Sequence, residues 1–148
     1  MIESSGPEET RALGERVGRV AQSGDVLLLS GELGAGKTLF VQGIARGLGY
    51  EGPVSSKSFV ILGQYAGRVT LYHADLYRLD DPGQVQELGL DEITADGVLA
   101  VEWPERAEWV LPEERLLIRF EVTGEDTRRL HPDPRGERAE ALAGALRD

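Results

Sequence analysis

The sequence predicts an α/β domain in which a mixed parallel and antiparallel sheet is flanked by helices. Residues 26–29 and 98–101 are short, continuous apolar runs, which are typical of strands covered on both faces. Residues 58–76 are rich in strand-forming residues and resemble a hairpin. The segments around these strands repeat apolar residues at helical spacing, so helices are expected to pack on the sheet.

The first helix and strand follow directly from local signals. Ser5 followed three residues later by Glu8 matches a capping box, which predicts a helix from about Pro7 to Gln22. Turn-forming residues 23–25 interrupt this pattern. We therefore expect the first buried strand at residues 26–29, leading straight into a glycine-rich segment.

A second helix is predicted from Thr38, with Gly47 or Gly49 supplying its left-handed end. The hairpin should comprise residues 58–65 and 68–76, separated by two residues. The remaining expected elements are a turn at 80–83, a short helix before Gly97, a buried strand at 98–101 ending at Glu102, a helical turn at 104–110, a strand at 116–122 with a partner at 127–131, and a final helix opened by Asp133 and Pro134.

Length and composition limit the organisation of the chain. Its 148 residues suit one hydrophobic core, so we expect a single domain over residues 1–148, with residues 1–6 and about 132–148 peripheral to it. The absence of cysteine excludes disulfides and thiolate metal sites. No apolar run approaches the roughly 20 residues that span a bilayer, and the amino terminus lacks a signal-peptide pattern. We expect a soluble, cytoplasmic protein that makes no membrane contact.

The net charge of −10 disfavours direct, strong binding to nucleic acid, because a field of this sign repels a phosphate backbone. Lysine is rare, since Lys37 and Lys57 are the two lysines among 16 basic residues. Lys37 stands where a compact ammonium on a thin stem can reach between two phosphates.

The segment from Gly31 to Thr38 fits the phosphate-loop pattern G-x-x-x-x-G-K-[ST] between a predicted strand and a predicted helix. Glycines let successive backbone N–H groups converge on phosphate oxygens at the positive end of the helix. The pattern predicts a P-loop NTPase-like domain that binds ATP with Mg²⁺. The residues expected to bind the nucleotide are Gly31, Glu32, Leu33, Gly34, Ala35, Gly36, Lys37, Thr38 and the following Leu39.

Acidic residues that could serve a Mg–ATP site stand at two predicted strand ends. Lys37 is expected to bridge the β- and γ-phosphates, and the Thr38 hydroxyl to bind Mg²⁺. Asp75 ends the second hairpin strand, and Glu102 ends the strand at 98–101. Because ligands collect at the carboxyl ends of parallel strands, both acids are candidates for holding the metal or orienting water.

Four segments together resemble the TsaE family, formerly YjeE, the bacterial ATPases of tRNA threonylcarbamoyladenosine modification. The similarity runs from about Thr10 to Leu130. The resemblance places Thr38, Asp75 and Glu102 at metal and catalytic positions, and Trp103 beside the nucleotide. The segments that carry it are the phosphate loop, Tyr72-His73-Ala74-Asp75-Leu76-Tyr77-Arg78-Leu79, Glu87-Leu88-Gly89-Leu90 and Val101-Glu102-Trp103-Pro104-Glu105-Arg106.

One segment departs from the family pattern. The family carries Ser-Pro-Thr-Phe in a switch-like loop, where this chain has Ser56-Lys57-Ser58-Phe59. Ser58 keeps the hydroxyl, whereas Lys57 replaces a rigid proline with a flexible cation, either as a phosphate contact or as an exposed charge.

Other residues are given ordinary roles. We expect core or surface positions for His73 and His131, packing for Trp109, a nearby acidic partner for Arg78, and either a surface role or the family's basic pair for Arg128 and Arg129.

The resulting hypothesis is an ATPase whose slow hydrolysis drives a change of state in partner proteins. Lys37 and Glu102 are the expected catalytic residues, and Glu102 orients water while Asp75 helps Thr38 to hold Mg²⁺. The resemblance implies TsaD and TsaB as partners and tRNA contact only through them. Two alternatives remain at this point: a small-molecule kinase, and an adaptor that senses nucleotide without hydrolysing it.

Overall fold

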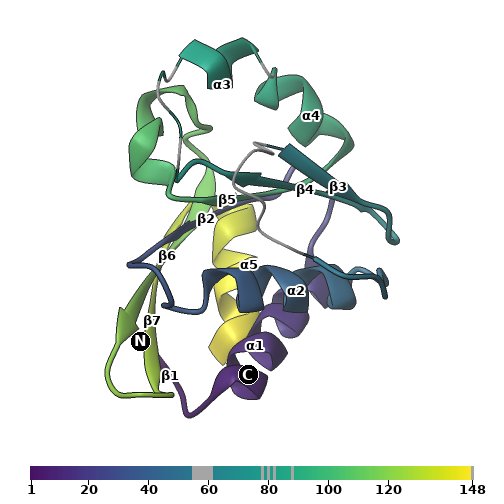
Figure 1. The fold of residues 1–148 in the computed structure, drawn as a ribbon. Coiled ribbons are helices and arrows are strands. Elements are labelled where there is room, and N and C mark those ends of the chain that lie inside the picture. The colour runs from purple at the N-terminus through teal and green to yellow at the C-terminus, as the bar shows by residue number, and fades with distance from the viewer. Residues whose placement is uncertain (55–61, 78, 80, 82, 88, 148) are drawn as a thin grey trace.

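The computed structural model describes residues 1–54, 62–77, 79, 81, 83–87 and 89–147. They form a seven-stranded sheet in the order β1-β7-β6-β2-β5-β4-β3, with helices on both faces (Figure 1). The strands are β1 (Ile2–Ser4), β2 (Val26–Ser30), β3 (Leu62–Tyr65), β4 (Thr70–Asp75), β5 (Gly97–Glu102), β6 (Arg115–Val122) and β7 (Arg128–Arg135). The helices are α1 (Pro7–Val20), α2 (Lys37–Gly47), α3 (Gly83–Glu87), α4 (Leu90–Asp96) and α5 (Glu137–Arg147), with short 3₁₀ turns η1 (Pro104–Arg106) and η2 (Glu108–Val110).

The sheet is mixed, as the sequence predicts. Strand β2 pairs in parallel with β5 and β6, and β5 pairs in parallel with β4. The outer pairs β3–β4, β6–β7 and β1–β7 are antiparallel. The carboxyl ends of β2, β4, β5 and β6 therefore meet at one edge, which is where the candidate site lies.

Strand β2 is buried on both faces, which confirms the interpretation of its apolar run. Leu27 and Leu29 belong to the core that α1, α2 and α5 cover, whereas Val26 and Leu28 belong to the core beneath α3, η1 and η2. Figure 1 shows α1, α2 and α5 on one side of the sheet and α3 and α4 on the other. The glycine-rich segment thus begins at the end of a strand that is covered on both faces.

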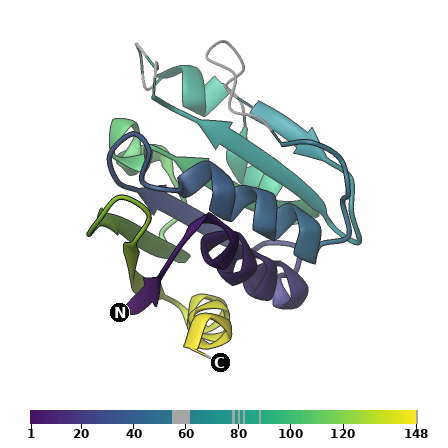
Figure 2. The same cartoon turned by 60° about the horizontal axis from the view of Figure 1, so that its bottom comes forward.

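Helices α1 and α2 lie side by side in unusually close contact (Figure 2). A Cβ at Gly14 would overlap the carbonyl oxygen of Phe40, and one at Gly43 would overlap the carbonyl oxygen of Arg11. Gly18 and Gly47 meet in the same way one turn further along. The absence of side chains at these positions lets α1 support the helix that begins with Lys37.

The carboxy-terminal part of the chain differs from the sequence prediction. Asp133 and Pro134 do not open the final helix, because both lie in β7, where Pro134 faces Leu116 of β6. Proline is tolerated there because β1 covers β7 only up to Leu130, which leaves the rest of the strand as an edge. Helix α5 begins after Gly136 and buries its apolar face on the sheet.

The start of α1 also differs in detail. The N-cap is Gly6, which makes no side-chain cap hydrogen bond, so the capping box predicted from Ser5 and Glu8 is wrong. The Ser5 hydroxyl donates to the Glu9 carboxylate, and the Ser5 amide donates to the same oxygen at 3.3 Å. These bonds lower the pKa of Glu9. The helix itself is confirmed and ends at Val20.

The predicted hairpin is confirmed for β3 and β4, which pair with Tyr65 opposite Leu71. The connection is four residues long, 66–69, rather than two, because the second strand begins at Thr70. Residues 58–61 of the expected first strand lie outside the described residues. Within the described ranges, no helix is long and apolar enough to cross a membrane.

The close helix contact predicts opposite effects for two glycine substitutions. Gly43→Ala forces α1 and α2 apart and should lower the free energy of unfolding by about 1–3 kcal/mol. Gly144→Ala in α5 meets open space and should raise the free energy of unfolding by up to about 1 kcal/mol. Urea unfolding of both variants measures these changes, and equal stability of the two would contradict the packing described here.

Candidate nucleotide-binding site

The loop between β2 and α2 has the backbone shape expected of a phosphate loop. Gly31, Gly34 and Gly36 have φ angles of 144°, 80° and 102°, a region that side chains disfavour. A Cβ at Gly31 would also lie 2.7 Å from the carbonyl oxygen of Phe120. The loop therefore needs glycine at these positions for its own conformation.

The other loop residues are arranged around this backbone. The side chains of Glu32 and Leu33 are exposed at the tip, and Leu33 is 66% exposed. Ala35 is fully buried under the loop, and its amide donates to the carbonyl of Glu32 at 3.1 Å. Leu39 is half-buried in the first turn of α2.

Lys37 is the first residue of α2 and is only 4% exposed. Its ammonium donates to the carbonyl oxygen of Gly31, and Nζ lies 3.5 Å from the centre of the Trp103 ring. Burial lowers the pKa of Lys37, while the negative charges of Glu102 and then Glu105 and Asp75 oppose this shift. The site thus holds a positive charge in a partly dehydrated position.

The structure brings Thr38 and Glu102 together. The Thr38 hydroxyl donates toward both carboxylate oxygens of Glu102 at 3.2 Å. Asp75 lies directly opposite Glu102 on the neighbouring strand, and its Oδ1 accepts the Tyr77 amide at 3.1 Å. The two acids predicted at strand ends therefore end adjacent strands on the loop side of the sheet.

Trp103 follows Glu102 and has a strained backbone. Its φ of 60° is the only positive value for a non-glycine residue in the described part of the chain. Its amide donates to the carbonyl of Leu29 at 3.2 Å, and its ring contacts the Tyr77 ring at a centroid distance of 4.9 Å. These contacts hold the indole against Lys37, beside the loop.

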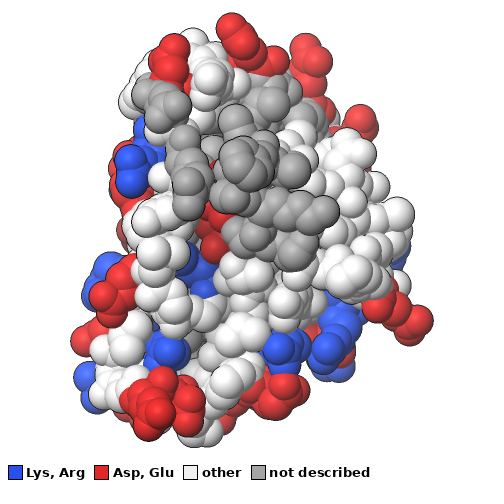
Figure 3. Space-filling model, in the orientation of Figure 1, with Lys and Arg blue, Asp and Glu red and all other residues white. Residues whose placement is uncertain are grey.

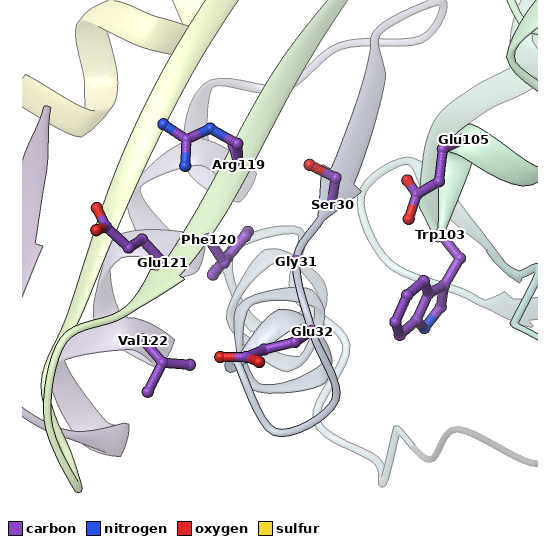
Figure 4. A pocket seen from close by; sticks show the side chains of 9 residues that line it. All are labelled: Ser30, Gly31, Glu32, Trp103, Glu105, Arg119, Phe120, Glu121 and Val122. Carbon is purple, nitrogen blue, oxygen red and sulfur yellow. The ribbon is translucent and has the colours of Figure 1, made fainter.

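A groove of about 530 Å³ opens beside the loop at the ends of β2 and β6. Figure 4 shows Trp103 and Glu105 on one side of Gly31, and Arg119, Glu121 and Val122 on the other. Its position next to Gly31 makes it continuous with the phosphate loop.

The oxygen donors at this edge fit a hard divalent cation. Thr38, Asp75 and Glu102 offer one hydroxyl and two carboxylates, the ligand types that Mg²⁺ prefers. The described residues contain no cluster of three or more acidic, histidine or cysteine ligands that would enclose a metal by itself. This donor set suits an ion that also takes oxygens from phosphates and water.

His73 lies in the core, which agrees with the expected core or surface position, but its contact with Glu102 was not predicted. Its Nε2 lies 2.6 Å from Oε2 of Glu102, and both side chains are buried. The available signal was the spacing of His73 and Asp75, because residues two apart on a strand share a face.

Arg128 also contacts the site, because it donates to the Gly34 carbonyl at 3.0 Å. The other candidates form different contacts, and one of them involves Glu121 of the groove. His131 pairs with Glu121 at 2.8 Å, and Arg129 pairs with Glu3 at 3.5 Å. Trp109 is 68% exposed, so its predicted packing role is wrong. The remaining candidates Lys57, Ser58 and Arg78 lie outside the described residues.

Comparisons with known proteins give one consistent result. The family model described as "Threonylcarbamoyl adenosine biosynthesis protein TsaE" matches residues 4–130. The tRNA threonylcarbamoyladenosine biosynthesis protein TsaE of Bacillus subtilis is 44% identical over 142 residues, covering 95% of this chain and 89% of the relative. The Treponema pallidum protein of the same name is 39% identical over 128 residues, covering 86% and 95%. The crystal structure of Bacillus subtilis YdiB matches with a TM-score of 0.81 at 40% identity, covering 98% of this chain and 91% of that one.

The electrostatics of the site predict how the pKa of Lys37 responds to its neighbours. Glu102→Gln removes the strongest charge that opposes the effect of burial, so the pKa of Lys37 should fall further below its ordinary value. NMR titration of protein labelled at lysine Cε measures it, and the presence of only two lysines simplifies assignment. Glu140→Gln on the exposed side of α5 is the control. An unchanged or raised pKa in Glu102→Gln would contradict the described coupling.

Proposed function

Because this chain belongs to the TsaE family, we propose that it binds ATP with Mg²⁺ and hydrolyses the ATP slowly in support of tRNA threonylcarbamoyladenosine modification. The single observation that carries the ATPase part is the buried Lys37 ammonium at the mouth of a loop with three left-handed glycines. A triphosphate is the ligand whose charge and shape suit both features.

Residues of the loop bind and orient the triphosphate in this proposal. Backbone amides of the 31–38 segment donate to phosphate oxygens, and Lys37 moves from the Trp103 ring to the β- and γ-phosphates. The Thr38 hydroxyl and the Asp75 carboxylate would hold Mg²⁺, which when bound offsets the negative charge that develops on the phosphates. Trp103 then lies beside the bound nucleotide.

Glu102 acts on the water in this proposal. The water oxygen attacks the γ-phosphorus, the bond from that phosphorus to the β–γ bridging oxygen breaks, and ADP and phosphate result. Glu102 orients this water by accepting a hydrogen bond from it, and takes up the proton that the water releases. Glu102 is 3% exposed and lies beside Lys37 and Thr38, where an oriented carboxylate is protected from bulk solvent.

The proposed partners are TsaD and TsaB, and tRNA reaches the assembly through them. The net charge of −10 supports this division, because a protein of this charge gains little from facing tRNA alone. On the face seen in Figure 3, basic side chains are interspersed with acidic ones rather than gathered in a patch. A cytoplasmic location is part of the same proposal.

The kinase alternative has less support. A small-molecule kinase uses an arginine-rich lid to cover the phosphates and exclude water. Between Trp103 and Leu117 the chain carries Arg106 and Arg115. Arg115 is buried and pairs with Glu108 at 2.9 Å, so it is not available to a lid.

The proposal predicts a loss of turnover when the proposed water-orienting acid is neutralised. Glu102→Gln should lower kcat for ATP by about 100-fold or more, because general-base contributions are typically about 10² to 10⁴. Phosphate release by the purified chain, alone and with TsaB and TsaD, measures kcat, and Glu140→Gln is the matched control.

Three outcomes of this assay would count against the proposal. If kcat of Glu102→Gln equals that of the wild type, Glu102 has no part in the reaction. Turnover near zero in the wild-type chain even with both partners would favour the nucleotide-sensing adaptor. Phosphate release that requires an added acceptor would favour the kinase.

A further inference from the structure

His73 makes a buried contact that the proposed reaction does not yet explain. The imidazole is 4% exposed and its Nε2 lies 2.6 Å from Oε2 of Glu102, which is 3% exposed. Burying two polar side chains is costly unless they satisfy each other. The direction of this bond depends on the histidine tautomer, and a carboxylate that accepts requires the tautomer with its proton on Nε2 of His73.

The sheet fixes the position of His73 relative to Glu102. In the parallel pair β4–β5, Asp75 is opposite Glu102 and His73 is opposite Ala100. His73 and Asp75 share a strand face, and Ala100 and Glu102 share the corresponding face of the next strand. Strand register therefore sets this diagonal contact between His73 and Glu102.

The Glu102 carboxylate also contacts the first turn of α2. Thr38 is 3.2 Å from both of its oxygens and belongs to the segment that binds phosphate and metal in the proposed function. The last side-chain torsion of glutamate, χ3, adopts a broad range of values, so the side chain alone does not fix the plane of its carboxylate. His73 supplies an anchor that does not depend on the loop.

We propose that His73 is a positioning residue that sets the orientation of the Glu102 carboxylate toward the attacking water. The inference rests on the proposed function of Glu102 and deepens it. Loss of the anchor should act on the chemical step rather than on ATP binding, because His73 is directed at Glu102 and not at the phosphate loop. A displacement of about 1 Å at such a group can cost about 100-fold in rate.

Two amide substitutions of His73 distinguish a positioning role from a mere need for a polar side chain. The amide nitrogen of His73→Gln reaches about as far as imidazole Nε2, whereas that of His73→Asn stops near the position of Nδ1. We expect His73→Asn to lower kcat by about 10- to 100-fold with KM for ATP nearly unchanged, and His73→Gln to recover most of this loss. Phosphate release by the full-length chain with Mg–ATP, normalised to the nucleotide-binding fraction of each preparation, gives both constants. Equal kcat for the two variants, or a change confined to KM, would overturn the proposal.

A double-mutant test distinguishes failure of this inference from failure of the proposed function. In a Glu102→Gln background, His73→Asn should cause little further loss, because the group that His73 positions is already disabled. If Glu102→Gln is inactive while His73→Asn retains wild-type kcat, only the positioning role fails. If Glu102→Gln itself retains wild-type kcat, the proposed role of Glu102 fails, and the positioning role fails with it.

Discussion

The candidate site is organised around one feature that is unfavourable by itself, the burial of the Lys37 ammonium at the start of α2. Lys37 makes no ion pair within the part of the chain that the structure describes, and it contacts a carbonyl oxygen and an indole ring instead. Burial disfavours its charge, and the carboxylate of Glu102 helps to retain it. In the proposed function, the triphosphate of ATP would supply the ion-pair partner that this ammonium lacks in the described residues.

The surrounding fold maintains this arrangement at some loss of stability. Glycines at the α1–α2 contact give up side-chain packing so that α1 can lie directly against α2. Trp103 keeps a left-handed backbone, which costs on the order of 1 kcal/mol, and its indole contacts Lys37. The buried pair of His73 and Glu102 further restricts side-chain positions at the same edge of the sheet. The strained backbone and the buried polar groups thus lie at the candidate site, which is where proteins commonly accept such losses of stability.

The parts that the sequence could predict are those defined by local pattern. The segment from Gly31 to Thr38 and the two-sided burial of β2 follow from residue types at fixed spacing. The contact of His73 with Glu102 depends on strand register, which a single sequence does not reveal. The predicted helix start at Pro134 is wrong because proline is tolerated in β7, and this tolerance depends on which residues β1 covers. Tertiary pairing decided both of these cases.

Equilibrium binding of Mg–ATP to Lys37→Ala tests the central claim most directly. Loss of one charge-assisted contact of about 1.5–3 kcal/mol predicts about 10- to 100-fold weaker affinity. Arg46→Ala, which removes an exposed charge from the last turn of the same helix, should bind like the wild type. Equal affinity of Lys37→Ala and the wild type would contradict the account, because the buried ammonium would then have no part in holding the triphosphate.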